Sequence, residues 1–278
     1  ATASYNGGEV VTKTVEVTVK EQTRSVPDGA YAAVTFLSDG ATTNGKIGEA
    51  LYESATDGNN FFSFSEINSG NPVIVSNTDT KGLRDPYVLK SKDGDKFYMI
   101  ATDLKVSSQG WGQNQQYGSL KLEAWESTDM VNWTRTNAED GDTGIKVNAD
   151  NMGMTWAPEA FWDDALNSYV VFWSSREYTD DTRATAVKSS KTNGAYNILV
   201  MATRDFKTFT PAEKWQDTQY SRIDSTVFKI GDMYYRLTKN EESGKAGDYI
   251  TNGKSTFLER SQCLTCTTTT ADPNADTT

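Results

Sequence analysis

Short apolar runs separated by polar turns occupy most of this 278-residue chain. The segment DPYVLKSKDGDKFYMIAT, which starts at Asp85, has two apolar runs around Asp93-Gly94, a pair that suits the positive φ angles of a tight hairpin turn. The segments APEAFWDDALNSYVVFWSS, from Ala157, and DSTVFKIGDMYYRLTK, from Asp224, have the same order of strand, turn and aromatic-rich strand. The pattern therefore predicts three equivalent β-hairpins, at intervals of 72 and 67 residues.

A second strand-rich unit follows each hairpin. LKLEAWESTDMVNWTRT (120–136) and YNILVMATRDFKTFTPA (196–212) each contain a strand, an Asp and, four residues later, an aromatic ring. EALYESATDGNNFFSF (49–64) has a similar pattern, and GKSTFLER (253–260) is a degraded copy. Helical periodicity is absent throughout, and about four short strands per repeat are typical of a β-propeller blade. A two-sheet sandwich is the rival architecture, but sandwiches do not repeat at this spacing.

The two ends of the chain do not fit the repeat. EVVTKTVEVTVKE (9–21) alternates like one half-buried strand, so we interpret residues 1–27 as the end of an immunoglobulin-like domain plus a linker. Residues 28–262 form the predicted all-β propeller domain, and the polar, Thr-rich residues 263–278 form a low-complexity tail. Only about three and a half blades are present, so we expect the propeller to be incomplete.

Composition excludes several classes of function. With 27 basic and 38 acidic residues the net charge is −11, which argues against a nucleic-acid partner. No apolar run is long enough to predict a membrane span. The chain has no histidine, which excludes Ser-His-Asp catalysis and His-rich zinc sites. Its two cysteines, Cys263 and Cys266, are half of a zinc motif at most, and we regard them as incidental.

Asp85, Ala157 and Asp224 occupy the same register of the three hairpins. The first strand of each propeller blade lines the central channel, so these positions should converge near the axis. A single strand-start Asp is usually a turn cap. Two of them at equivalent positions, flanked by apolar residues, favour a functional site, because a carboxylate is costly to bury.

The ordered combination RDPYVLK, DMVNW, WAPE and IDSTVF resembles glycoside hydrolase family 43 over roughly residues 28–260. The resemblance implies a five-bladed propeller that cleaves arabinofuranosides or xylosides with inversion. It implies that Asp85 is the general base and that Asp224 orients the acid and raises its pKa. Inversion requires a base and an acid about 6.5–9.5 Å apart, with water between them.

The sequence departs from the family at the acid. The family's Glu-Gly-Pro motif does not occur after Asp224, and the glutamates that follow are Glu241, Glu242 and Glu259. Glu159 of WAPE is better placed than these, although the family uses this region to line the pocket. The histidine through which family members hold a channel ion is also absent. We expect no required cofactor; a structural calcium ion stays an open alternative.

Four residues are candidates for binding the substrate. Trp111 lies in a polar, Gly-rich segment (109–118) that we interpret as a binding loop, where an indole could stack on a sugar ring. Trp156 and Glu159 lie at the mouth of the second hairpin, and Arg84 precedes the presumed base. Packing and surface pairing are the alternative roles.

The sequence thus predicts an extracellular or cell-surface glycoside hydrolase acting on arabinofuranosyl or xylosyl linkages of plant poly- or oligosaccharides. The chain could be inactive alone, because the acid is missing from its expected place. The alternative is a non-catalytic carbohydrate-binding or structural propeller fragment. An invertase-like retaining propeller fits less well, since its Asn-Asp-Pro-Asn and Glu-Cys motifs are absent.

Overall fold

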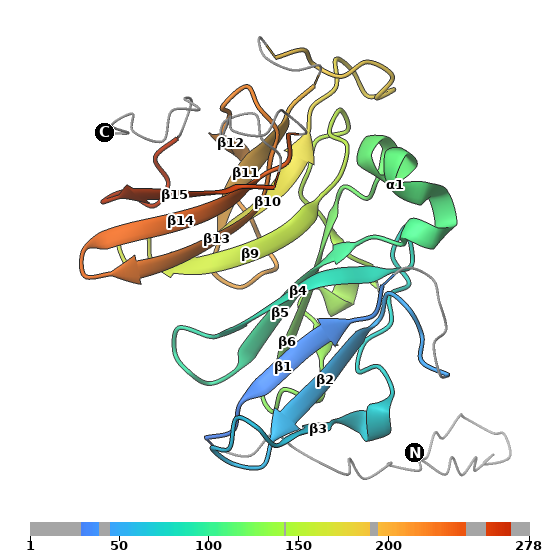
Figure 1. Ribbon diagram of the computed structural model, residues 1–278, viewed down its shortest axis with the longest axis vertical. Coiled ribbons are helices and arrows are strands. Elements are labelled where there is room, and N and C mark those ends of the chain that lie inside the picture. The colour runs from blue at the N-terminus through green and yellow to red at the C-terminus, as the bar shows by residue number, and fades with distance from the viewer. Residues whose placement is uncertain (1–28, 39–44, 142, 190–193, 243–253, 268–278) are drawn as a thin grey trace, which may run out of the picture.

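The computed structural model describes residues 29–38, 45–141, 143–189, 194–242 and 254–267. These residues form four antiparallel sheets, which follow one another along the chain (Figure 1). The predicted immunoglobulin-like remnant and residues 268–278 lie outside this described part. Among the described residues, no helix has both the length and the apolarity needed to cross a membrane.

The four sheets have three, five, four and three strands. The first contains β1 (Ala32–Phe36), β2 (Leu51–Thr56) and β3 (Phe64–Glu66). The second contains β4 (Leu83–Lys90), β5 (Phe97–Asp103), β6 (Lys121–Ser127), β7 (Thr134–Arg135) and β8 (Ile145–Lys146). The third contains β9 (Trp156–Asp163), β10 (Ser168–Arg176), β11 (Tyr196–Thr203) and β12 (Glu213–Gln216). The fourth contains β13 (Arg222–Ile230), β14 (Met233–Asn240) and β15 (Thr256–Ser261).

The first strands of successive sheets pack against one another, β1 on β4, β4 on β9 and β9 on β13. This arrangement is that of propeller blades, and the predicted all-β propeller fold is confirmed. The three predicted hairpins are β4–β5, β9–β10 and β13–β14. In the first of them, Gly94 has the positive φ (74°) that the turn requires.

The apolar residues of neighbouring sheets form the core between them. The largest cluster joins the second and third sheets around Tyr98, Trp173 and Phe206. The repeated Asp of each second unit has a local role: Asp129 and Asp205 each accept two backbone N–H groups of the residues that follow. Such Asx turns fix the bend between the third and fourth strands of a blade.

One sequence-based expectation of the fold was wrong: a helix is present. α1 (Val106–Tyr117) connects β5 to β6, with a kink at Gly110 (φ 77°), and it contains the segment that we interpreted as a loop. The helix escapes detection because Ser, Gln, Gly and Asn dominate it and only Val106 and Asn114 are buried. Without an apolar stripe there is no 3.6-residue period to read.

The predicted tail boundary at 263 falls inside a packed segment. Cys263 and Cys266 form a disulfide, so they are not incidental free thiols. Between them, the buried Leu264 packs beside Trp215, Val227 and Tyr234, and its carbonyl accepts a hydrogen bond from the Trp215 indole N–H (2.9 Å). Leu264 therefore anchors this segment to the third and fourth sheets.

Candidate active site

Asp85, Ala157 and Asp224 share one unusual backbone conformation at the start of β4, β9 and β13. Their φ angles are 50°, 48° and 54°, in the left-handed region that non-glycine residues rarely occupy. At each position the register with the second strand shifts, which marks a β-bulge. A bulge re-aims the side chain that it carries, at a cost of about 1–3 kcal/mol in backbone strain. The repeat thus builds the same strained feature three times, twice around a carboxylate.

Hydrogen bonds tie the bulges at Ala157 and Asp224 to the preceding sheet. The backbone N–H of Ala157 donates to Oγ1 of Thr102 (2.8 Å), which in turn donates to Oδ2 of Asp85 (3.0 Å). One sheet further on, the backbone N–H of Asp224 donates to Oγ of Ser174 (3.2 Å). Because Thr102 and Ser174 occupy the same register of β5 and β10, the relation repeats from blade to blade.

Asp85 lies in a low-dielectric environment with charges of both signs around it. Burial raises the pKa of its carboxyl group, and the charge of Asp224 raises it further. The hydrogen bond from Thr102 and the charges of Arg84 and Lys239 act in the opposite direction. Lys239 also binds Asp224 directly, Nζ to Oδ2 2.9 Å. Asp224, 139 residues away in sequence, is therefore close enough to influence the ionisation of Asp85.

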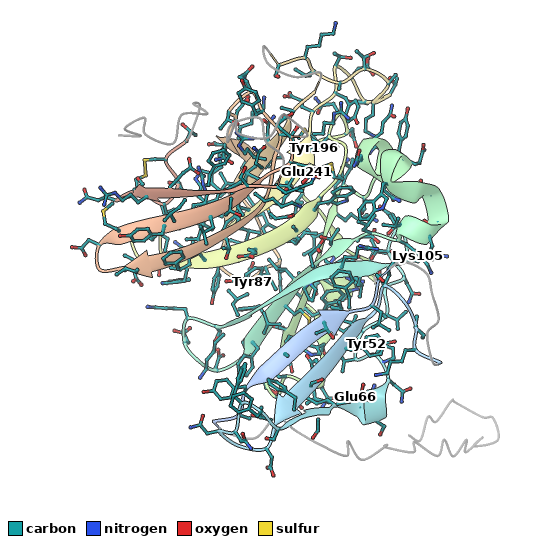
Figure 2. All side chains as sticks on the ribbon, viewed as in Figure 1. Tyr52, Glu66, Tyr87, Lys105, Tyr196 and Glu241 are labelled. Atoms are coloured by element: carbon teal, nitrogen blue, oxygen red, sulfur yellow. A yellow bond between two sulfur atoms is a disulfide. The ribbon has the colours of Figure 1, made fainter. Side chains whose placement is uncertain are left out.

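Glu159, on β9, is the third carboxyl group of this site. Burial and the charge of Asp224 raise its pKa to about 7, although a hydrogen bond with Thr226 lowers it. Its Oε2 is buried and has no hydrogen-bond partner. Tyr87 lies where β4 faces β9 (Figure 2), and burial, helped by the charge of Glu159, raises its pKa to about 12. Burial thus brings the pKa of Glu159 from that of an ordinary carboxyl group toward neutral pH.

Aromatic rings and a guanidinium group form one side of the site. The rings of Trp111 and Trp156 meet edge to face, with centroids 5.9 Å apart. The guanidinium of Arg84 lies 5.1 Å from the Trp111 ring centroid and forms a buried ion pair with Glu49 (3.0 Å). Glu49 also accepts the backbone N–H of Val106, so the same carboxylate anchors the start of α1. Trp111 is half exposed, and its indole is thus accessible for stacking.

The structure brings all six predicted site residues into one region, but the sequence analysis missed three others. Thr102, Tyr87 and Lys239 each contact or act on one of the carboxyl groups. Lys239 could have been found, because it lies in the second strand of the third hairpin, in the register of Thr102 and Ser174.

The glutamates that follow Asp224 have structural partners. Glu241 forms ion pairs with Lys239 and Lys254, Glu242 accepts the backbone N–H of Ser221, and Glu259 binds Arg236. Within the described part of the chain, no group of three or more His, Cys, Asp or Glu side chains could hold a metal ion.

Comparison with known proteins identifies the family of the chain. A family model described as "probable glycosyl hydrolase domain", related to glycoside hydrolase family 43, matches residues 27–277. The chain belongs to this family. The expected resemblance to family 43 is thus confirmed.

One relative of the chain is a curated protein from Bifidobacterium longum subsp. longum that is named α-L-arabinofuranosidase. The two are 62% identical over 278 residues, and the match covers 99% of this chain but 26% of the relative. The chain therefore spans about a quarter of the length of that protein.

Solved structures share the fold at low sequence identity. An α-L-arabinofuranosidase from Clostridium thermocellum has a TM-score of 0.56 and 13% identity, covering 86% of this chain and 67% of the other. An α-L-arabinanase from Penicillium chrysogenum, complexed with arabinobiose, has a TM-score of 0.52 and 12% identity, covering 87% and 62%. At this identity, the comparison supports the propeller architecture and nothing finer.

Proposed function

We propose that this chain carries the catalytic carboxyl groups of an inverting, extracellular or cell-surface glycosidase that acts on arabinofuranosyl linkages of plant polysaccharides, with xylosyl linkages as a second substrate class. The observation that carries the proposal is the pair of equivalent bulges that hold Asp85 and Asp224 beside Lys239. The name of the relative from B. longum supports arabinofuranosides as the first substrate to test.

Asp85 suits the role of general base. Thr102 donates to its Oδ2, which leaves Oδ1 to accept a proton from water as that water attacks the anomeric carbon. The charges of Arg84 and Lys239 counteract the effect of burial, so the carboxyl group can ionise. After the attack, the proton resides on Asp85 and the glycosidic oxygen must gain another.

Glu159 is the carboxyl group of the described chain best suited to supply that second proton. The charge of Asp224 raises its pKa, which is how a neighbouring carboxylate keeps a general acid protonated near neutral pH. Asp224 itself forms an ion pair with Lys239. The two aspartates and Glu159 would then act as base, modulator and acid without a cofactor.

Hydrolysis of two substrates separates these roles. 4-Nitrophenyl α-L-arabinofuranoside has a leaving group that departs without protonation, whereas an arabino-oligosaccharide needs the acid. Asp85→Asn should reduce the hydrolysis of both by at least about 100-fold. Glu159→Gln should reduce hydrolysis of the oligosaccharide far more than that of the aryl glycoside. Asp232→Asn, on the exposed β13–β14 turn, is the matched control and should change neither.

The stereochemistry of the product tests the mechanism. Proton NMR of the first sugar released should show the anomer opposite to that of the substrate. Release of the same anomer, or full activity of Asp85→Asn, would overturn the assignment of Asp85 as the base. The relative from B. longum serves as the positive control for both substrates.

A non-catalytic carbohydrate-binding role is the second candidate. It is favoured by the lack of the Glu-Gly-Pro motif and by the ion pairs and hydrogen bonds that occupy Glu241, Glu242 and Glu259. This reading predicts no hydrolysis of either substrate, together with arabino-oligosaccharide binding measured by the fluorescence of Trp111 and Trp156.

A further inference from the structure

A cavity of about 270 Å³ lies at the C-terminal end of α1. The end of the helix, the start of β6 and the turn around residue 183 enclose it. Its lining includes charged, amide and phenol groups: Asp79, Gln109, Tyr117, Lys121, Lys146 and Arg183. None of them belongs to the candidate active site. A mixed lining of donors, acceptors and one aromatic ring is suited to a saccharide.

Arg183 is held in a fixed position at this cavity. Its Nη1 donates to the carbonyl oxygens of Gly118 (3.1 Å) and Met152 (3.2 Å), and its guanidinium lies 5.5 Å from the Tyr117 ring centroid. Among the described residues, Nε and Nη2 of Arg183 donate to no protein atom, and no carboxylate forms an ion pair with it. The guanidinium can therefore offer two N–H groups to one carboxylate, the geometry that Arg favours.

The charge balance around the cavity favours an anion. Lys121 is paired with Asp79 (2.8 Å), and Lys146 is paired with Asp150, so each lysine is neutralised by a partner. Among the described residues, no carboxylate neutralises the charge of Arg183 in this way. The charged residues that line the cavity, one aspartate against two lysines and an arginine, carry a net positive charge, whereas the whole chain has a net charge of −11.

The helix connects this cavity to the candidate active site. Trp111 and Tyr117 lie on the same helix, six residues apart, which corresponds to about 9 Å along its axis. Both rings are partly exposed. A chain-like ligand that stacks on Trp111 could therefore extend to Tyr117 and Arg183.

We propose that this cavity binds a carboxylate-bearing sugar unit, such as a uronic acid, of the polysaccharide that enters the active site. The inference rests on the proposed function only in that the ligand is a polysaccharide. The cavity would then select acidic polysaccharides over neutral ones of the same backbone.

Calorimetric titration with two probes tests the proposal. The probes are a xylo-oligosaccharide that carries one glucuronic acid branch and the neutral oligosaccharide of the same backbone length. We expect the acidic probe to bind at least fivefold more tightly. Arg183→Gln should abolish this difference, and Lys121→Gln, which frees Asp79 to repel the ligand, should reduce it. Lys207→Gln, an exposed lysine on a distant turn, should leave it unchanged.

Equal affinity for the two probes, or an unchanged preference in Arg183→Gln, would overturn the proposal. Circular dichroism and the unfolding temperature of Arg183→Gln establish whether this variant is still folded. If it is not, the proposal is tested by Lys121→Gln, which should reduce the preference for the acidic probe. Hydrolysis of the aryl arabinofuranoside by Arg183→Gln should equal that of the unmodified chain. A failure of this site is thereby distinguished from a failure of the proposed activity, which Asp85→Asn reports.

Discussion

Lys239 binds Asp224 across the β13–β14 hairpin, with Nζ 2.9 Å from Oδ2. This lysine occupies the register that Thr102 and Ser174 hold in the two preceding sheets. The second and third sheets thus have a hydroxyl group at this position, and the fourth sheet has the Lys239 cation. The cation stands where Asp224 comes close to Asp85. The cation reduces the repulsion between the two aspartates, which would otherwise hinder the ionisation of Asp85.

Lys239→Met should shift the pH dependence of kcat/KM. The charge of Lys239 lowers the pKa of Asp85, so its removal raises that pKa. A base must be ionised, and the acidic limb of the profile should therefore move to higher pH. The measurement is aryl arabinofuranoside hydrolysis between pH 4 and 9, with Lys207→Met as the control. A limb that moves to lower pH would contradict the assigned relation.

Thr102→Val should destabilise the protein and leave its shape unchanged. The hydroxyl is fully buried, accepts from the Ala157 N–H and donates to Asp85. Valine has a similar volume but leaves both groups without a partner, at a cost of about 1–3 kcal/mol. Urea unfolding measures the loss, and Thr134→Val, on an exposed position, is the matched control. Equal stability of the two variants would show that the hydrogen bonds of Thr102 make no net contribution to the free energy of unfolding.

Glu53→Gln should make the protein more stable at high pH. Burial raises the pKa of Glu53 to about 7 from 4.5, despite a hydrogen bond from Trp133 (2.8 Å). Because the unfolded state releases this proton more readily, the wild-type chain loses stability as pH rises from about 4.5 through about 7. Glutamine can still accept from Trp133 and has no charge to bury.

The unfolding temperature at pH 5 and pH 8 checks this prediction. The difference between Glu53→Gln and the unmodified chain should be larger at pH 8. Glu139→Gln, at an exposed position, should show no such pH-dependent gain. A variant that loses stability at pH 8 relative to pH 5 as steeply as wild type would indicate that Glu53 ionises freely in the folded state.

Trp111→Ala should weaken the binding of arabino-oligosaccharides by about tenfold, equivalent to about 1.4 kcal/mol. The indole is half exposed, so its loss should change stability little. Phe62→Ala is the control, because Phe62 is also aromatic and is 94% exposed, in the turn between β2 and β3. The affinity of both variants for the oligosaccharide is measured by titration. An equal loss of affinity in the two variants would mean that Trp111 does not bind the sugar directly.

The sequence by itself determined the strands and their repetition, because alternation, aromatic content and turn chemistry are local properties. It also placed Asp85, Ala157 and Asp224 in one register, since a repeat maps equivalent positions without any knowledge of space. Helix α1 was missed because it buries only two residues and so leaves no apolar period. Leu264 was missed because one buried residue in a polar segment gives no pattern.

Only the tertiary structure decided which groups act on one another. The pKa values of Asp85 and Glu159 depend on burial and on Asp224, whose charge reaches them from another sheet. The same holds for Arg183, which lies 65 residues from the carbonyl that fixes it. Electrostatic interaction depends on distance and dielectric environment, and neither quantity is a property of neighbours along the chain.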